Sequence, residues 1–477
     1  MADASGCGHP PMATPAGTPE HPLRVAVVGS GPAGFYAAGH LLAAKDATVQ
    51  VDLIDRLPTP FGLVRAGVAP DHPKIKSVTR VYEKTAAREG FRFFGNVEVG
   101  RDIFHAELKR HYHAVIYAVG AQTDRSLGIE GEDLPGSWAA TEFVAWYNAH
   151  PDSCDLEFDL SAKRAVVIGN GNVAMDVARM LVLPREELEG TDTADRAIDA
   201  IADSGVEEVV IIGRRGPAQA AFTNPELREL GELTDADVIV DPAEMELDEH
   251  SARSIEGEGE ITARRNVEIL NDYAGRTPEG KRKRVLLRFL RSPVAIHGED
   301  RVESIELVVN RLEHGGDGRL RAQATGERET LEAGLVFRSI GYRGVAIEGV
   351  PFDEWHGSIP NEEGRVMNPS EQTSIPGEYV AGWIKRGPSG VIGTNKRDAQ
   401  ETVEHLLEDM AEGRLPEPEN PDPAAVEALI AQRNPDLVTY AGWEAIDAAE
   451  KAAGEPLGRP RVKLTRIEEM LEVARDA

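Results

Sequence analysis

The chain has 477 residues, 41% of them hydrophobic and 28% charged, which is the balance of a globular protein with two or three domains. No apolar run reaches the roughly 20 residues that a membrane helix needs. The formal net charge of -29 argues against nucleic acid and anionic membranes as partners, because their phosphates would be repelled at long range.

The first 22 residues are rich in Pro, Gly and Ala and lack the basic and apolar regions of a secretory signal. We expect residues 1–22 to form a disordered tail. The two cysteines, Cys7 and Cys154, are too few for a cluster, a zinc finger or a Cys-x-x-Cys redox pair. The sequence therefore predicts no metal site and a cytoplasmic location, where thiols stay reduced.

A strand, a Gly-rich turn and a helix open the folded part of the chain. Apolar residues 23–28 precede Gly29-x-Gly31-x-x-Gly34, and the next strand ends at Asp55. In this fingerprint the glycines allow a tight turn, the approach of a pyrophosphate and close packing of the helix on the strand. A carboxylate after the second strand selects an unphosphorylated ribose, as in FAD or NAD. The alternative is a structural Gly turn.

The rest of the first unit is less regular. A long loop rich in Pro and Gly follows Asp55, and we expect a helix over 77–89, a strand pair within 91–100 and a strand over 113–120.

The strand, turn and helix recur about 140 positions later as Gly169-x-Gly171-x-x-Ala174. Here the second strand ends in Arg214 and Arg215 instead of an acid. Two guanidiniums can hold a 2'-phosphate through charge-assisted bonds, each worth about 1.5–3 kcal/mol. The pair therefore predicts NADP(H), and the alternative is a solvated surface pair.

Two turns with opposite preferences in one chain imply FAD and NADPH, because hydride transfer between them explains why both are present. We predict an α/β fold with two Rossmann-like domains, in which the NADP-binding domain is inserted into a discontinuous FAD-binding domain, as in glutathione reductase. The FAD domain comprises 23–120 and 336–477, including C-terminal helices, and the NADP domain comprises 121–335. Two segments in 281–313 are expected to form meander-like strands.

Several longer strings carry a family resemblance: "LPTPFGLVRAGVAPDHPKIK", "AVVIGNGNVAMDVAR", "GRRGPAQAAFT" and "GWIKRGPSGVIGTNKRDAQ". With them the chain resembles ferredoxin–NADP reductases of the adrenodoxin-reductase type, from about Leu23 to Leu471. The resemblance implies an enzyme that transfers a hydride from NADPH to FAD and then single electrons to a ferredoxin. It also implies a monomer and an acidic iron–sulfur ferredoxin as partner.

The resemblance assigns residues to each nucleotide. For FAD, in addition to the Gly29, Gly31 and Gly34 turn, these are Ala33, Asp55, Leu63, Val99, Trp383, Gly390, Val391 and Ile392. The family usually has Glu where this chain has Asp55. For NADP(H), they are Arg125, Asn170, Gly171, Asn172, Val173, Arg214, Arg215 and Glu226.

The resemblance also places His72 near the nicotinamide and flavin, hydrogen-bonded to Glu229, and these two are the catalytic candidates. Hydride transfer needs no general acid, so we expect a tuning role only. Taken alone, His72 would be a structural residue in a turn, and Glu226 and Glu229 would be ordinary acids of the first helical turns, after a cap at Asn224.

Docking of an acidic ferredoxin to an acidic chain requires a local basic face. The candidates are Lys74, Lys76, Arg80, Lys385, Arg386, Lys396 and Arg397. Three other functions stay open: a flavin monooxygenase or oxidase, an electron-delivering subunit of the glutamate-synthase type, and a non-catalytic nucleotide-bound redox sensor. The second of these needs a Cys-ligated cluster region, which the two cysteines cannot supply.

Overall fold

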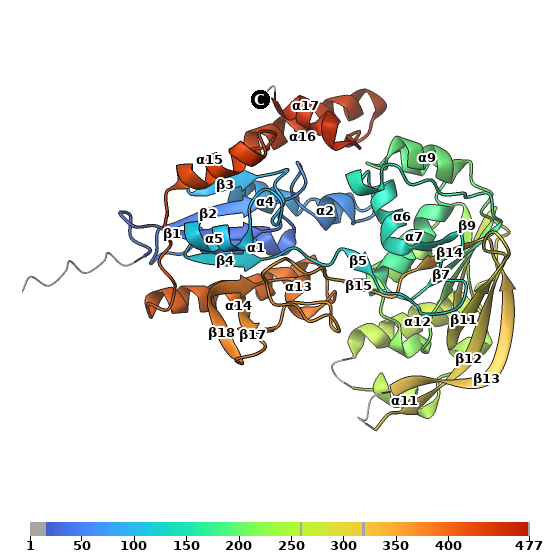
Figure 1. Cartoon of the computed structure of the whole chain (residues 1–477). Helices are drawn as coiled ribbons and strands as arrows, with labels where there is room; N and C mark the ends of the chain where they lie inside the picture. Colours follow the sequence, from blue (N-terminus) through green and yellow to red (C-terminus); the bar gives the residue numbers. More distant parts are fainter. Residues whose placement is uncertain (1–15, 258–259, 317–319, 476–477) are drawn as a thin grey trace, which may run out of the picture.

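The computed structural model describes residues 16–257, 260–316 and 320–475, which fold into two lobes, with a mixed sheet in the first and a parallel sheet in the second (Figure 1). The expectations for residues 1–15, including Cys7, lie outside these ranges. Residues 16–22 were predicted to belong to the disordered tail, and this is wrong. The carbonyl of Gly17 accepts a bond from the Thr48 amide (2.7 Å), and His21 Nε2 lies 3.0 Å from Glu417 Oε2.

The first lobe contains a seven-stranded sheet in the order β16-β17-β18-β4-β1-β2-β3. Every residue of β1 is buried, and all are apolar except Arg24, whose guanidinium pairs with Asp52 on β2 at 2.7 Å. The predicted strand pair in 91–100 is wrong, since only one strand forms there, parallel to β2. The bounds are β1 Leu23–Val28, β2 Val49–Ile54, β3 Phe91–Phe94, β4 Ala114–Tyr117, β16 Asn361–Glu362, β17 Arg365–Asn368 and β18 Thr373–Val380.

Helices α1 and α14 pack against each other beside this sheet. The helix expected over 77–89 is shorter and spans only Thr79–Ala86. The helices of this lobe are α1 Pro32–Leu41, α2 Leu63–Ala66, α3 Pro73–Lys76, α4 Thr79–Ala86, α5 His105–His111, α13 Trp383–Arg386 and α14 Ile392–Ala411.

The second lobe contains a six-stranded parallel sheet in the order β6-β14-β7-β8-β10-β9. The bounds are β6 Ser137–Ala139, β7 Arg164–Ile168, β8 Glu208–Ile212, β9 Ala236–Val240, β10 Lys283–Arg288 and β14 Leu335–Arg338. The predicted domain boundary between 335 and 336 falls inside β14, which pairs with β6 and β7. The sheets therefore move this boundary to a point after Arg338.

The β10 strand corrects a second expectation. Its polar sequence suggested a meander, but it lies between β8 and β9 and parallel to both. Lys283 is buried there because its ammonium donates to the carbonyl of Leu181 (2.8 Å) near the end of a helix, and burial lowers its pKa to about 8. The predicted meander does form further on, from β11 Arg291–His297, β12 Ser304–His314 and β13 Leu320–Glu332.

Two chain crossings connect the lobes and pair with each other as antiparallel strands β5 (Thr123–Asp124) and β15 (Tyr342–Arg343). The helices of the second lobe are α6 Ala140–Tyr147, α7 Asn172–Val182, α8 Arg185–Glu189, α9 Asp195–Ala202, α10 Asn224–Leu230, α11 Glu249–Ser254 and α12 Ile261–Gly275. Short 3-10 helices are η1 Pro151–Ser153, η2 Pro217–Gln219, η3 Pro242–Met245 and η4 Glu455–Leu457. None of the helices in the described ranges joins enough length to enough apolar character to cross a bilayer.

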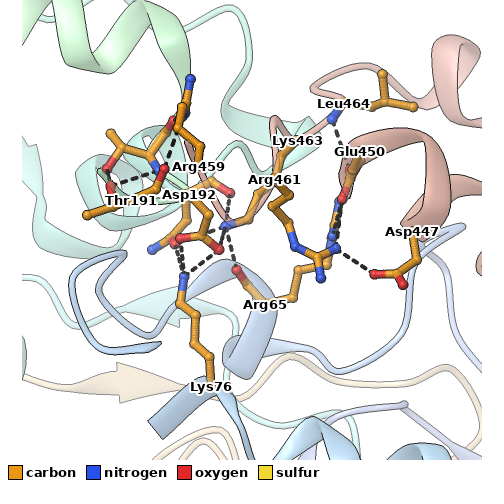
Figure 2. A network of polar contacts seen from close by, with 12 residues as sticks. Arg65, Lys76, Thr191, Asp192, Asp447, Glu450, Arg459, Arg461, Lys463 and Leu464 are labelled. Carbon is orange, nitrogen blue, oxygen red and sulfur yellow. Dashed lines mark hydrogen bonds and ion pairs between the residues drawn. The ribbon is translucent and has the colours of Figure 1, made fainter. Parts of the chain in front are cut away.

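The C-terminal helices α15 (Pro423–Arg433), α16 (Tyr440–Gly454) and α17 (Ile467–Arg475) lie along the first lobe, and the loop between α16 and α17 reaches α9 of the second (Figure 1). Lys463 Nζ in this loop lies 3.0 Å from Asp192 Oδ2 and donates to the carbonyl of Arg65 (Figure 2). Lys76 Nζ contacts the same carboxylate at 2.6 Å. One buried carboxylate thus holds two ammonium groups that come from other parts of the chain.

We expect Asp192→Asn to lower the free energy of unfolding by about 3–5 kcal/mol, because it leaves the buried Lys463 without its anion. Denaturant unfolding followed by fluorescence at pH 7 measures the change. Asp199→Asn is the matched control, since Asp199 is 70% exposed and pairs only with Arg185. It should cost no more than about 1 kcal/mol, and equal effects of the two variants would contradict the expectation.

Candidate functional site

The two Gly turns have the same local geometry. Gly29 has a φ of 104° and Gly169 a φ of 125°, and a Cβ on them would lie 2.5 Å from the Ala118 oxygen and 2.0 Å from the Ser339 oxygen. Only glycine fits such positions. Gly31 and Gly171 are the N-caps of α1 and α7, and a Cβ on either would meet no atom within 4 Å. Each turn therefore leaves space at a helix N-terminus, where an anion is stabilised.

The other predicted FAD residues gather around the first turn. A Cβ on Gly34 would lie 1.9 Å from the Gly29 oxygen, so the third glycine allows α1 to approach the strand. Ala33 is buried against Gly382, the residue before Trp383. Asp55 Oδ2 accepts bonds from the amide and hydroxyl of Ser30, at 2.8 and 2.5 Å. The carboxylate therefore lies directly beside the turn.

Trp383 begins α13, and its indole Nε1 is buried without a hydrogen-bond partner. Its ring centroid lies 5.3 Å from that of Tyr342 in the linker. Nearby, Gly390 and Val391 are exposed, and Ile392 opens α14. An unpaired buried donor and an open helix N-terminus fit a bound flavin, which offers acceptors and takes up negative charge.

Leu63 and Val99 are less informative. Leu63 opens α2 and is half-buried, and Val99 is half-buried against the core of the first lobe. Their predicted contacts with FAD stay predictions.

The second turn is tied to the loop after β8. Asn172 Oδ1 accepts a bond from the Thr223 amide (2.8 Å), and the Asn170 carbonyl accepts one from Ala221 (3.0 Å). The Asn170 amide nitrogen is buried without a partner and points to Gly213, where a Cβ would lie 2.6 Å from it. Val173 is half-buried at the start of α7. An orphaned donor next to an open turn fits a dinucleotide here as well.

Arg214 is exposed and Arg215 half-buried directly after β8. Within the described part of the chain, neither guanidinium forms an ion pair. Burial, and then the charge of Arg214, lowers the pKa of Arg215. Two adjacent cations without a counterion are suited to bind a phosphate. Arg125 follows β5 in the linker, and its side chain is exposed.

His72 brings the two lobes together. It is the N-cap of α3 in the first lobe, and its Nε2 lies 2.6 Å from Glu229 Oε2 and 3.7 Å from Glu226 Oε2 on α10 of the second lobe. The expected contact between His72 and Glu229 is therefore present, while their role in catalysis stays a prediction. The expected cap at Asn224 is wrong, because Thr223 is the N-cap and the Asn224 amide donates to Thr262 and Asn266.

Sequence reasoning missed the centre of this cluster, which is Arg179 on α7. Its Nε lies 2.6 Å from Asp71 Oδ2, and its Nη2 lies 2.7 Å from Asp176 Oδ1. Nη1 lies 3.5 Å from Glu226 Oε2. The spacing of Asp176 and Arg179, three positions apart on a helix, was the available signal, but the contact with Asp71 required the tertiary structure.

The cluster has more carboxylates than cations, and this environment shifts the pKa values of the carboxyl groups. The pKa of Glu226 is raised to about 7, first by burial and then by the charge of Asp176. Burial also raises the pKa of Asp176. Asp71, although buried, has a lowered pKa because it bonds to Arg179. The site can thus hold a proton near neutral pH.

Three of the seven basic residues predicted to form a docking face are already paired. Lys76 binds Asp192. Lys385 Nζ lies 2.5 Å from Glu401 and 3.3 Å from Asp398, and Arg386 bonds to Asn395. These three residues thus have partners on other elements, and their part in docking stays a prediction. The exposed residues that remain are Lys74, Arg80, Lys396 and Arg397.

One lobe has a Gly turn beside a carboxylate. The other has a Gly turn beside two arginines that form no ion pair with the described residues. Together these features define an oxidoreductase that binds two dinucleotides. In agreement, the pyridine nucleotide-disulphide oxidoreductase family matches residues 23–230. The chain is 53% identical over 462 residues to the NADPH-ferredoxin reductase FprA of Mycobacterium leprae, covering 95% of this chain and 99% of that protein. The chain belongs to the family of NADPH-ferredoxin reductases.

Two further relatives support this assignment. The mitochondrial NADPH:adrenodoxin oxidoreductase of Salvelinus fontinalis is 44% identical over 475 residues, which cover 97% of this chain and 92% of that one. The structure of Mycobacterium tuberculosis FprA in complex with NADPH is similar with a TM-score of 0.89 and 51% identity, covering 95% of this chain and 100% of that one. The predicted family and fold class are confirmed.

We expect the Glu226 carboxyl to make stability depend on pH. Between its ordinary pKa of 4.5 and about 7, the folded state keeps a proton that the unfolded chain has released. The free energy of unfolding therefore falls as the pH rises through this window. Glu226→Gln removes this loss, so its melting temperature relative to the parent protein should be higher at pH 8 than at pH 5.

Thermal unfolding at the two pH values tests this expectation. Glu232→Gln, on the exposed surface just after α10, is the control and should give the same difference from the parent protein at both pH values. A Glu226→Gln variant that behaves like this control would contradict the assignment.

Proposed function

We propose that the protein is a flavoprotein oxidoreductase that oxidises NADPH, with FAD as its bound cofactor, and passes single electrons to a ferredoxin-type acceptor. The observation that carries this function is the contrast between the two turns. One lies beside the carboxylate of Asp55, and the other lies beside Arg214 and Arg215, which have no ion-pair partner among the residues that the structure describes. FAD, when bound, supplies the ring that accepts a hydride and returns electrons one at a time.

In this proposal the first lobe holds FAD. Asp55 binds the adenosine ribose, the Gly29 turn and Ala33 face the pyrophosphate, and Trp383 with Gly390, Val391 and Ile392 contacts the flavin. Leu63 and Val99 complete the site beside the flavin and the adenine. The domain comprises residues 23–120 and those after Arg338.

The second lobe then holds NADPH. Asn170, Gly171, Asn172 and Val173 bind the pyrophosphate at the N-terminus of α7, and Arg214 and Arg215 bind the 2'-phosphate. Glu226 and Arg125 are further contacts. Because α7 also carries Asp176 and Arg179, nucleotide binding and the interlobe ion cluster share one helix.

His72 has a positioning and tuning role in this scheme. Its bond to Glu229 crosses between the lobes, so it helps to hold the nicotinamide site against the flavin site. The surrounding carboxylates supply a place for a proton beside the site, with no nucleophilic side chain required.

We expect Arg214→Ala with Arg215→Ala to raise the KM for NADPH about a hundredfold, because two charge-assisted contacts to the 2'-phosphate are lost. The KM for NADH should stay the same. Arg185→Ala is the control, since Arg185 is half-buried on α8 and pairs with Asp199. Steady-state reduction of ferricyanide with each nucleotide measures both constants. A protein without bound flavin, or one reduced equally well by NADH and NADPH before the substitutions, would refute the proposed function.

The acceptor can be described more closely as a proposal. An acidic iron–sulfur ferredoxin docks on the exposed Lys74, Arg80, Lys396 and Arg397, and the reductase acts as a monomer. Helices α4 and α14, which carry three of these residues, both pack on α1.

We expect Lys396→Glu with Arg397→Glu to slow reduction of such a ferredoxin at least about tenfold at low salt, because docking of opposite charges accelerates association. Ferricyanide reduction should be unchanged. Stopped-flow measurements over a range of ionic strengths test this. Lys163→Glu, an exposed residue of the second lobe, is the control. Rates that stay constant as salt rises would contradict electrostatic docking.

A further inference from the structure

The turn that carries Arg214 and Arg215 is held by the three-stranded β11-β12-β13 sheet. The backbone carbonyls of Gly213, Arg214 and Arg215 each accept a hydrogen bond from a residue in or next to this sheet. The amide of Arg291 donates to the Gly213 carbonyl (3.0 Å), and the amide of Leu290 donates to the Arg215 carbonyl (3.1 Å). The Arg214 carbonyl between them is bound by a side chain.

That side chain is Asn310 on β12, which is 5% exposed. Its Nδ2 lies 2.9 Å from the Arg214 carbonyl oxygen and 2.8 Å from Ser292 Oγ. A carbonyl can only accept, so the amide nitrogen must face Arg214. Asn310 is therefore the one side chain among the described residues that bonds to the backbone of the arginine pair.

The local backbone is shaped for this contact. The pairing of β12 with β13 shifts register between Val308 and Asn310, where residues 325–327 of β13 lie opposite the single residue Val309. Leu290 has a φ of 55°, in the left-handed region that non-glycine residues seldom adopt. The backbone amide of Leu290 donates to the Arg215 carbonyl, and the Leu290 carbonyl accepts a bond from the backbone amide of Asn310 (2.8 Å). Two irregular positions thus converge on the turn.

The ion pairs around the turn engage the nearby carboxylates and leave the arginine pair available. Arg288 and Arg291 also lie close by, and both pair with Glu244 and Glu329. These carboxylates are thereby occupied, and Arg214 and Arg215 keep no ion-pair partner within the ranges that the structure describes. The sheet therefore supports the turn and leaves its two cations free.

We propose that Asn310 is a specificity-determining positioning residue, which fixes the backbone of Arg214 so that the arginine pair meets the 2'-phosphate of NADPH. This inference rests on the proposed function. The Asn310 side chain bonds to the Arg214 carbonyl and to Ser292, so it acts through Arg214 on the 2'-phosphate and has no part in hydride transfer. Its loss should reduce the preference for NADPH over NADH and leave turnover at saturation intact.

Asn310→Leu keeps the size of the side chain and removes the donor. We expect the KM for NADPH to rise about tenfold, with kcat within about twofold and the KM for NADH unchanged. Binding of adenosine 2',5'-bisphosphate, measured by titration calorimetry, should weaken about tenfold. Binding of adenosine 5'-monophosphate should not change. Asn310→Asp, which also lacks the donor, should show the same selective loss if the leucine variant does not fold.

Thr325→Val is the matched control. The Thr325 hydroxyl donates to the Val309 carbonyl at the same register shift but does not bond to the turn that carries Arg214 and Arg215. Its loss should therefore leave the KM values for NADPH and NADH unchanged. In an Arg214→Ala background, Asn310→Leu should cause no further loss of bisphosphate binding, because the two residues act as one unit.

The outcomes separate this inference from the function on which it rests. If the parent protein binds the two adenosine probes equally, the proposed function fails. If Arg214→Ala weakens the bisphosphate selectively and Asn310→Leu does not, only the role of Asn310 fails. Equal weakening of NADH and NADPH by Asn310→Leu would also overturn it, because that result indicates a general structural defect.

Discussion

The contact between the two lobes is the constraint on which the function depends. Hydride transfer requires the reacting atoms of the nicotinamide and flavin rings to approach to about 3–3.5 Å, and in the proposed scheme each ring is held by a different lobe. Two buried ion clusters cross that contact, one centred on Arg179 and one on Asp192. Buried ion pairs contribute little net stability, but they are specific in geometry because a misplaced charge is costly. They are therefore suited to define one relative orientation of the lobes.

The two nucleotide sites show how few residues distinguish similar folds. Both lobes repeat a strand, an open Gly turn and a helix, and the chemistry diverges at the residue that follows the second strand. Asp55 accepts bonds from neutral donors of Ser30 and Leu57, whereas Arg214 and Arg215 have no anionic partner among the described residues. A chain with a large negative charge can still present such local cations, because nearby carboxylates such as Glu244 and Glu329 are bound to other arginines.

Features set by neighbouring residues could be predicted from the sequence. The Gly turns, the strands before them and the arginine pair depend on local geometry, and the structure has them in the expected places. The errors concern long-range contacts. Lys283 made β10 look like an exposed strand because its partner is the carbonyl of Leu181 on α7. Lys76 looked free because its acid, Asp192, lies far away in the sequence, and Lys385 looked free because its acids lie on the next helix. Arg179 and Asn310 were missed for the same reason.

The antiparallel pairing of β5 with β15 has a consequence for how the chain folds. The whole second lobe lies in the sequence between β4 and β18, which are neighbours in the first sheet. Closing so long a loop in an unfolded chain is slow and entropically costly. Because the inserted lobe brings its own ends together at β5 and β15, its folding shortens that loop to residues 118–122 on one side and 344–372 on the other. We therefore expect the second lobe to fold first and the first lobe to complete its sheet afterwards.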